Sequence, residues 1–533
     1  MPRGPDLVIF GGRLVDGSGA PARSASVEIT GDRVRVVEGA SPGPPAPVRI
    51  DATGKVVAPG FIDLHSHSGL MLLVDPLHEP KVRQGVTTEV IGVDGNSYAP
   101  FVRREDLEDL IVLNGGLDGR PPIAPDWDSV ASYLGRFDGR VAVNIGFLVG
   151  NSALRICALG WADRPADAGA TARMRSMLAE AMSEGALGVS SGLDYPPGSY
   201  ADTAELAELA AEATRHGGFY HTHVRYPLGD RFLDPFREAL EIGRRAEGAV
   251  HITHLYHRSS HPGPPEALLE LVDGARAEGR DVTFDTYPFE WASTRLLIQL
   301  PQWVQSGGID ALRQRLADAQ VRDRIRAELR GPGASYAAGW SDVRLGYFAD
   351  PGLARWEART VADIAEETGQ EPVDLICDIL LLEDLRINQV TSGPSAASLP
   401  LFIRHPAGMV GTDSTFLGAK PSPRTYGSFP RILGQFVRDE ALLSLEEAVR
   451  KMTSAAAARL GIADRGLLRD GMKADVVVFD PEAVRSTATY DAPRSYPVGI
   501  EQVIVNGTPV IRDGVHTGAL PGRAVGRRRF GSA

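Results

Sequence analysis

Eight short apolar stretches, separated by segments with a helical pattern, constrain the fold of this chain more than any other feature. Strands that alternate with helices are typical of parallel sheets built from βαβ units. Eight such units predict an α/β fold of the TIM-like (β/α)8 barrel type, with its active site at the carboxyl ends of the strands. The predicted strands lie near residues 56–62, 87–93, 141–149, 186–191, 218–224, 249–255, 281–287 and 408–413, and the clearest helices are Ala170–Glu184, Thr203–His216 and Pro265–Glu278.

The two ends of the chain have a different sequence pattern, which predicts short strands separated by turns. Runs such as Ala474–Pro481 are closed by Gly, Asp or Pro, as strands usually are. We expect residues 1–57 and 466–533 to form one small β-sandwich domain together. The basic run Arg527–Arg529 is expected to be a solvated tail.

Residues 58–465 are expected to form the barrel. Within them, the interval at about 289–389 is too long for a single crossover between strands. It contains helical patterns at Ile309–Arg330 and Thr360–Thr368. We therefore predict an insertion near the mouth of the barrel.

The composition excludes several classes of partner. The net charge is -12, which disfavours nucleic acid and anionic membrane surfaces. No apolar run approaches the ~20 residues of a membrane span, and the first residues lack an apolar signal core, so we expect a cytoplasmic protein with a small-molecule substrate. Cys157 and Cys377 have no metal-like spacing and are interpreted as core thiols. The sequence leaves homo-oligomer formation open.

Histidine and aspartate recur where the predicted strands end. In an extended chain residues i and i+2 point the same way, so His65 and His67 can reach one ion. Six of the 12 histidines gather at three strand ends. Imidazole and carboxylate groups are ligands for Zn²⁺ or a similar divalent ion. The residues at or after strand ends are His65, His67, Asp94, His221, His223, His251, His254 and Asp413.

These residues predict a hydrolytic centre. Two ions bridged by a carboxylate would generate a strong nucleophile from water near neutral pH. Asp413, at the last strand, could take the proton and pass it to a leaving group. His221 and His251 are interpreted as residues that support or pack against the ligands, because offsets of two and three residues from His223 and His254 do not guarantee that they share the face of those ligands.

The chain resembles the amidohydrolase superfamily, and most closely the N-acyl-D-amino-acid deacylase (D-aminoacylase) family. The resemblance runs nearly from end to end and is specific for the family, though not for a substrate. The matching segments are P-G-F-I-D-L-H-S-H at 59–67, Q-G-V-T-T-E-V-I-G at 84–92, A-L-G-V-S-S-G-L-D-Y-P-P-G at 186–198, T-H-V-R at 222–225, I-T-H-L at 252–255, D-T-Y-P-F at 285–289, G-T-D-S at 411–414, S-P-R-T-Y-G-S-F-P-R at 422–431 and G-M-K-A-D-V-V-V-F-D at 471–480.

The resemblance implies a role for each matching residue. His65 and His67 would hold one metal ion, and His223 and His254 would hold the other. Asp413 would be the catalytic acid/base and a ligand of the first ion. Arg424 would bind a substrate carboxylate, since its guanidinium is a planar bidentate donor. The remaining residues implied to line the substrate pocket are Tyr287, Ser293 and Tyr195.

Three positions depart from the family pattern. Asp94 stands where the family has a bridging Cys, so the bridging ligand would be a harder one. Zn²⁺ remains the expected metal, in one or two copies, with Mn²⁺ or Fe²⁺ as alternatives. Tyr256 replaces a Lys that helps to bind the substrate carboxylate, and we treat it as a candidate substitute donor. Asn151 replaces a His.

We therefore predict a metal-dependent amidohydrolase, in which hydroxide attacks the amide of an N-acyl-D-amino acid or a related compound. An alternative is hydrolysis of another C–N or C–O bond, such as that of a cyclic amide, carbamoyl group, dipeptide or lactone. A third reading is a non-catalytic barrel that serves as a scaffold. The presence of four ligand histidines and Asp413 argues against it.

Overall fold

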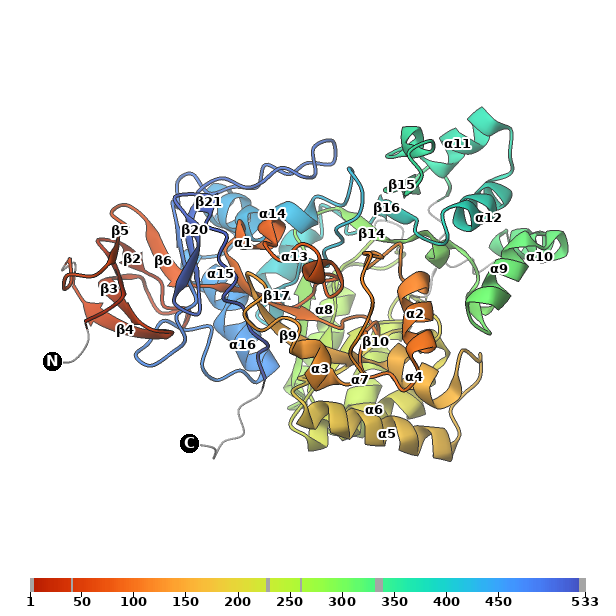
Figure 1. Ribbon diagram of the computed structural model, residues 1–533, viewed down its shortest axis with the longest axis horizontal. Coiled ribbons are helices and arrows are strands. Elements are labelled where there is room, and N and C mark those ends of the chain that lie inside the picture. The colour runs from red at the N-terminus through yellow and green to blue at the C-terminus, as the bar shows by residue number, and fades with distance from the viewer. Residues whose placement is uncertain (1–3, 40–41, 227–230, 259–260, 331–338, 527–533) are drawn as a thin grey trace.

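Eight parallel strands form a nearly closed barrel at the centre of the molecule (Figure 1). The computed structural model describes residues 4–39, 42–226, 231–258, 261–330 and 339–526. An isolated parallel bridge between Ser66 and Ser414 connects the segments that follow the first and last strands, which brings the barrel close to closure. All eight predicted strand regions contribute to it. The strands are β7 (Phe61–Asp63), β8 (Val86–Ile91), β9 (Asn144–Gly150), β10 (Gly188–Gly192), β11 (Tyr220–His223), β12 (Val250–Ile252), β13 (Val282–Thr286) and β17 (Gly408–Val410).

The first predicted strand, 56–62, divides into two strands that belong to different sheets. β6 (Val56–Pro59) pairs with strands from the chain termini, and only β7 enters the barrel. The division falls at Gly60, where a Cβ atom would lie 2.2 Å from Thr87 Oγ1. A side chain cannot fit there, so glycine permits the close approach at which the chain passes between the sheets.

A second, ten-stranded sheet joins the two ends of the chain. In it β6 pairs antiparallel with a C-terminal strand, with Val57 opposite Val478. The red and blue strands in Figure 1 therefore lie side by side, and they share an apolar core separate from that of the barrel. The basic run predicted to be a tail, Arg527–Arg529, lies outside the described residues. The other strands are β1 (Leu7–Phe10), β2 (Arg13–Leu14), β3 (Arg23–Thr30), β4 (Arg33–Glu38), β5 (Val48–Asp51), β18 (Val476–Phe479), β19 (Ile500–Val505), β20 (Thr508–Arg512) and β21 (Val515–His516).

Helices connect the barrel strands and cover the outside of the barrel. The three helices predicted most clearly are confirmed as α5 (Ala168–Ser183), α6 (Thr203–Arg215) and α8 (Glu266–Ala277). In α5, Met174, Leu178 and Met182 recur at helical spacing and are buried. The other helices of this part are α1 (Glu79–Val82), α2 (Arg104–Leu113), α3 (Val130–Leu134), α4 (Asn151–Leu159) and α7 (Asp234–Ala246).

Among its described residues, the interval from β13 to residue 398 contains a small three-stranded sheet and four α-helices, which lie at the far end of the molecule from the terminal strands (Figure 1). The predicted helix Ile309–Arg330 is two helices, because Asp318 ends the first and caps the second by accepting from the amides of Gln320 and Val321. The elements are β14 (Trp291–Arg295), β15 (Arg344–Leu345), β16 (Asn388–Ser392), α9 (Ile309–Ala317), α10 (Ala319–Leu329), α11 (Val361–Thr368) and α12 (Pro372–Leu382).

The chain completes the barrel with α13 (Leu399–Arg404), α14 (Arg424–Arg431), a π-helix at Ile432–Asp439, α15 (Leu445–Met452) and α16 (Ser454–Leu460). Both cysteines are free thiols: Cys377 is buried and Cys157 is partly buried. Among the described residues, no helix has the length and apolar character needed to cross a membrane.

Candidate metal centre

Five barrel strands bring six of the predicted ligand residues together at their carboxyl ends. All six side chains are buried, although each ends in a polar group. A barrel of parallel strands places such residues at one mouth, which is where the sequence predicts the active site. The residues are His65 and His67 after β7, Asp94 after β8, His223 at the end of β11, His254 after β12, and Asp413 after β17.

Asp63 fixes the first and last of these segments relative to each other. Its Oδ1 accepts hydrogen bonds from the amides of His65 (3.2 Å) and Thr412 (2.9 Å), and its Oδ2 pairs with the buried Lys81 ammonium. This network holds His65 next to the segment that carries Asp413.

Three of the ligand residues have a left-handed backbone. The φ angle is 51° at Asp94, 32° at His254 and 46° at Asp413. Asp and His tolerate this region better than most residues, but it is still strained, and such strain concentrates at functional sites. The surrounding barrel therefore imposes the conformation that turns these side chains inward.

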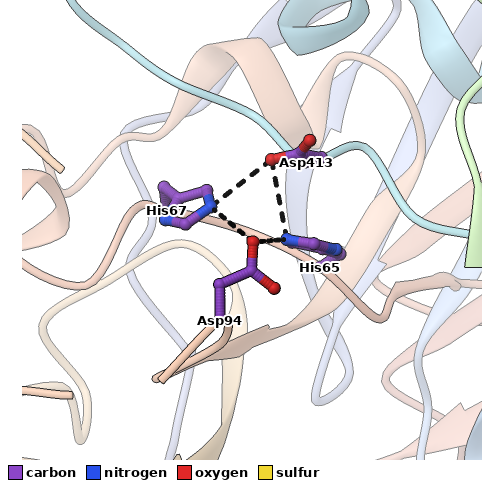
Figure 2. Close-up of side chains that lie close together, drawn as sticks. All are labelled: His65, His67, Asp94 and Asp413. Carbon is purple, nitrogen blue, oxygen red and sulfur yellow. Dashed lines mark ion pairs between the residues drawn. The ribbon is translucent and has the colours of Figure 1, made fainter. Parts of the chain in front are cut away.

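One oxygen atom lies at the centre of the group. Asp94 Oδ2 is 3.2 Å from His65 Nε2, 3.6 Å from His67 Nε2, 3.4 Å from His223 Nδ1 and 3.8 Å from His254 Nε2. Figure 2 shows Asp94 facing the first two histidines. The carboxylate thus occupies the position between two histidine pairs that a bridging ligand requires.

The two oxygen atoms of the Asp413 carboxylate have different neighbours: one lies beside the histidines and the other beside an arginine. Its Oδ1 lies 3.3 Å from His67 Nε2 and 3.5 Å from His65 Nε2 (Figure 2), while its Oδ2 lies 2.8 Å from Arg424 Nη1. Burial alone would raise the pKa of Asp413. The charges of Arg424 and His65 outweigh burial and lower that pKa, so the group is a carboxylate near neutral pH.

The residues present fit metal ions. Ligand atoms of His65, His67, Asp94 and Asp413 all lie within 4.8 Å of one another, and the same holds for Asp94, His223 and His254. His65 Nε2 and Asp94 Oδ1 are buried and have no hydrogen-bond partner in the part of the chain that the structure describes. Buried polar atoms without a partner are costly, and a bound ion would remove that cost.

The electrostatics of the centre also favour cations. Burial would raise the pKa of the Asp94 carboxyl, but the charge of His65 and hydrogen bonds from His223 and His254 hold that pKa well below its ordinary value. Asp94 is therefore ionised. An ionised carboxylate among imidazoles is a ligand set typical of divalent metals.

Three residues that the sequence analysis did not single out orient the histidines from behind. Asp118 Oδ1 lies 2.7 Å from His67 Nδ1, Asp194 Oδ2 lies 3.1 Å from His223 Nε2, and the Tyr226 hydroxyl lies 2.9 Å from His254 Nδ1. Partners of this kind fix the tautomer and direction of a metal-binding imidazole. Asp194 lies inside the matched segment at 186–198 and Tyr226 directly follows T-H-V-R, so both had a sequence signal. Asp118 had none.

The predicted substrate residues lie close to the ligand residues or to Arg424, which pairs with Asp413. The Tyr195 ring lies 4.9 Å from that of His223, and the Tyr287 ring lies 4.4 Å from the Arg424 guanidinium, which also donates to the Ser293 carbonyl at 3.0 Å. The Tyr195 hydroxyl already has a hydrogen-bond partner, because it lies 2.9 Å from the Thr294 hydroxyl.

The structure shows which groups surround Tyr256 and Asn151, two of the residues that depart from the family pattern. The Tyr256 ring packs 5.8 Å from the His254 ring, and its hydroxyl accepts from Arg258 Nη2 at 2.9 Å. Asn151 donates to the Gly198 carbonyl at 2.9 Å, and its side-chain oxygen leaves no room for a side chain on Gly95, next to Asp94. A cation thus remains close to position 256, although residue 256 itself is neutral.

Comparisons with known proteins agree with this geometry. A model of the amidohydrolase family matches residues 49–511. A D-aminoacylase from Alcaligenes xylosoxydans xylosoxydans is 33% identical over 98% of both chains, and an N-acyl-D-glutamate deacylase from the same organism is 35% identical over 95% of this chain and 93% of its own.

A solved structure gives the same result in three dimensions. The crystal structure of an N-acyl-D-glutamate deacylase from Bordetella bronchiseptica, in complex with zinc and a phosphonate inhibitor, superposes with a TM-score of 0.81 and 32% identity. The match covers 98% of this chain and 100% of that one. The chain therefore belongs to the amidohydrolase family, and within it to the family of the N-acyl-D-amino-acid deacylases, as its sequence motifs predict.

Proposed function

We propose that the protein is a metal-dependent deacylase that cleaves the amide of an N-acyl-D-amino acid into a carboxylate and a free D-amino acid. The observation that carries the proposal is the position of Asp94 Oδ2, within 3.8 Å of all four ligand histidines and opposite Asp413. Family membership supports amide hydrolysis, and the names of the relatives support the substrate class.

Zn²⁺ is the metal we propose. His65, His67, Asp94 and Asp413 would hold one ion, and Asp94, His223 and His254 would hold a second. When bound, such an ion supplies Lewis acidity, which activates water and polarises a carbonyl group. The zinc complex of the deacylase relative supports this choice. Because Asp94 is a harder ligand than a thiolate, Mn²⁺ and Fe²⁺ remain alternatives.

Asp413 is the residue that moves the proton. Its carboxylate is ionised and buried beside the histidines, so it can take the proton of the attacking water as the new C–O bond forms. The same group then returns the proton to the amide nitrogen as the C–N bond breaks. Arg424 holds the carboxylate by one oxygen and leaves the other directed at the centre.

The substrate carboxylate would be bound by Arg424, with Tyr287 and Ser293 around it. Arg424 Nε is buried and has no hydrogen-bond partner among the described residues. Arg258 beside Tyr256 offers a second cation close to the position where the family resemblance implies a lysine. The two guanidinium groups lie against the neighbouring Tyr256 and Tyr287 rings, and two cations this close favour a carboxylate-bearing substrate.

A second candidate is hydrolysis of a different C–N or C–O bond by the same residues. The replacements at Asp94 and Tyr256 favour it, because they change the bridging ligand and one wall of the pocket. The panel that separates the two contains N-acetyl-D-amino acids, cyclic amides, carbamoyl compounds, dipeptides and lactones, tested with the zinc-loaded wild type and with Asp413→Asn as control. We expect amine release from the N-acetyl-D-amino acids alone. Turnover confined to the other compounds would overturn the proposal.

A further inference from the structure

Three more ligand-type side chains lie together in the barrel interior, outside the centre described above. They are His221 on β11, His251 on β12 and Asp285 on β13, three neighbouring strands. Their ligand atoms lie within 4.8 Å of one another, and none of the three side chains is exposed. His221 and His251 are direct partners in the strand register, so their rings stack at 5.2 Å with an angle of 18° between them.

Packing does not account for His221. Neither of its ring nitrogens has a hydrogen-bond partner in the described ranges, although both are fully buried. A neutral imidazole carries one donor and one acceptor, and native interiors rarely leave both unsatisfied. The simplest explanation is that the His221 ring binds a group that is not part of the protein chain.

His251 and Asp285 are oriented as ligands would be. His251 Nδ1 is held by the Thr283 hydroxyl at 2.8 Å, which directs Nε2 to within 3.0 Å of Asp285 Oδ2. The other oxygen of Asp285 accepts from the His254 amide at 2.9 Å. Metal-binding imidazoles and carboxylates are held by outer partners in this way.

We propose that His221, His251 and Asp285 bind a divalent metal ion of the Zn²⁺ type, in addition to the ions of the centre at Asp94. Two imidazoles and one carboxylate form a common ligand set for Zn²⁺. The two sites are connected through Asp285, whose Oδ1 also lies 3.7 Å from His65 Nδ1. The inference does not depend on the substrate.

The first test counts ions. The wild type, His221→Leu and His216→Leu are loaded with Zn²⁺, freed of excess metal and analysed for zinc per chain by mass spectrometry. His216 is exposed on the surface and serves as the matched control. We expect His221→Leu to hold one ion fewer than the wild type and His216→Leu to hold the same number. Equal counts in all three folded proteins would overturn the proposal.

The second test needs no variant, so it stands even if His221→Leu fails to fold. A crystal of the zinc-loaded wild type, measured at the zinc absorption edge, is expected to show an anomalous density peak between the three side chains. The absence of an anomalous peak between the three side chains, or a water molecule in that place, would overturn the proposal. Either result is separate from the deacylase assay: an inner ion in a protein that cleaves no N-acyl-D-amino acid would contradict only the proposed function.

Discussion

Arg424 Nη1 lies 2.8 Å from Asp413 Oδ2, so the arginine predicted to bind substrate also holds the residue predicted to move the proton. Both side chains are buried, and the Tyr287 ring covers the guanidinium. With these proposed roles, substrate binding and proton transfer would be coupled through one ion pair. Mutations at either residue are expected to separate the two roles.

Asp413→Asn removes the proposed proton acceptor and keeps the shape of the side chain. General acid–base catalysis contributes about 10²- to 10⁴-fold, so kcat is expected to fall by at least about 10²-fold. The measurement is steady-state amide hydrolysis, with metal content determined on the same preparation, because Asp413 is also a candidate ligand. Near-normal kcat in the folded variant would exclude Asp413 as the proton-moving group.

Arg424→Met distinguishes the two roles of the arginine. If Arg424 binds the substrate carboxylate, KM for an N-acetyl-D-amino acid is expected to rise roughly 10- to 100-fold, the cost of a hydrogen bond to a charged group. The corresponding N-acetyl amino amide lacks the carboxylate and should show no such rise. Arg424→Lys, which keeps the charge without the planar fork, is the matched control. A fall in kcat of equal size for both substrates would mean that Arg424 acts only through Asp413.

The proposed bridging role of Asp94 is tested by exchange with cysteine, the bridging ligand that the family resemblance implies. Asp94→Cys keeps a bridging anion but makes it softer, so the ratio of bound Zn²⁺ to Mn²⁺ is expected to increase. Both metals are offered at equal concentration, and the bound ions are counted by mass spectrometry. Asp94→Ala, which removes the shared ligand, should bind fewer ions than the wild type. A full metal complement in Asp94→Ala would rule out a bridging role.

Glu89 makes stability depend on pH. It is fully buried, 3.0 Å from His78 and 3.9 Å from Lys81. Burial would raise its pKa, but His78 and Lys81 lower it from 4.5 to about 2. Since the folded pKa lies below the unfolded one, the contribution is complete above pH 4.5 and is lost as the pH falls through about 2. A shift of this size corresponds to roughly 3 kcal/mol.

The check compares urea unfolding midpoints at pH 5.5 and pH 3 in the wild type and Glu89→Gln. The wild type should lose more stability than the variant over this interval. Arg244 and Arg245 also lower the pKa of the partly exposed Glu241 to about 2, so Glu241→Gln controls for solvent-screened pairs and should behave like the wild type. An equal loss of stability between pH 5.5 and pH 3 in the wild type and in Glu89→Gln would show that Glu89 does not cause the pH dependence.

The sequence predicts the barrel and the ligand positions because both rest on local patterns. His65 and His67 follow an apolar strand, and parallel strands must bring such ends to one mouth. The division of the first strand at Gly60 depends on contact with Thr87, which is distant from it in the chain, so periodicity cannot show it. Asp118 reaches His67 from a loop 51 residues away and is likewise a product of tertiary structure.

Amine release from matched N-acetyl-D- and N-acetyl-L-amino acids decides whether the protein is a metal-dependent D-amino-acid deacylase. The protein is stripped of metal with a chelator, and one half is reloaded with Zn²⁺. We expect the reloaded protein to cleave the D enantiomer alone, the stripped protein to be inactive, and zinc-loaded Asp413→Asn to be slower by at least about 10²-fold. Cleavage without metal, or no turnover of either enantiomer by the zinc-loaded protein, would contradict the proposed function.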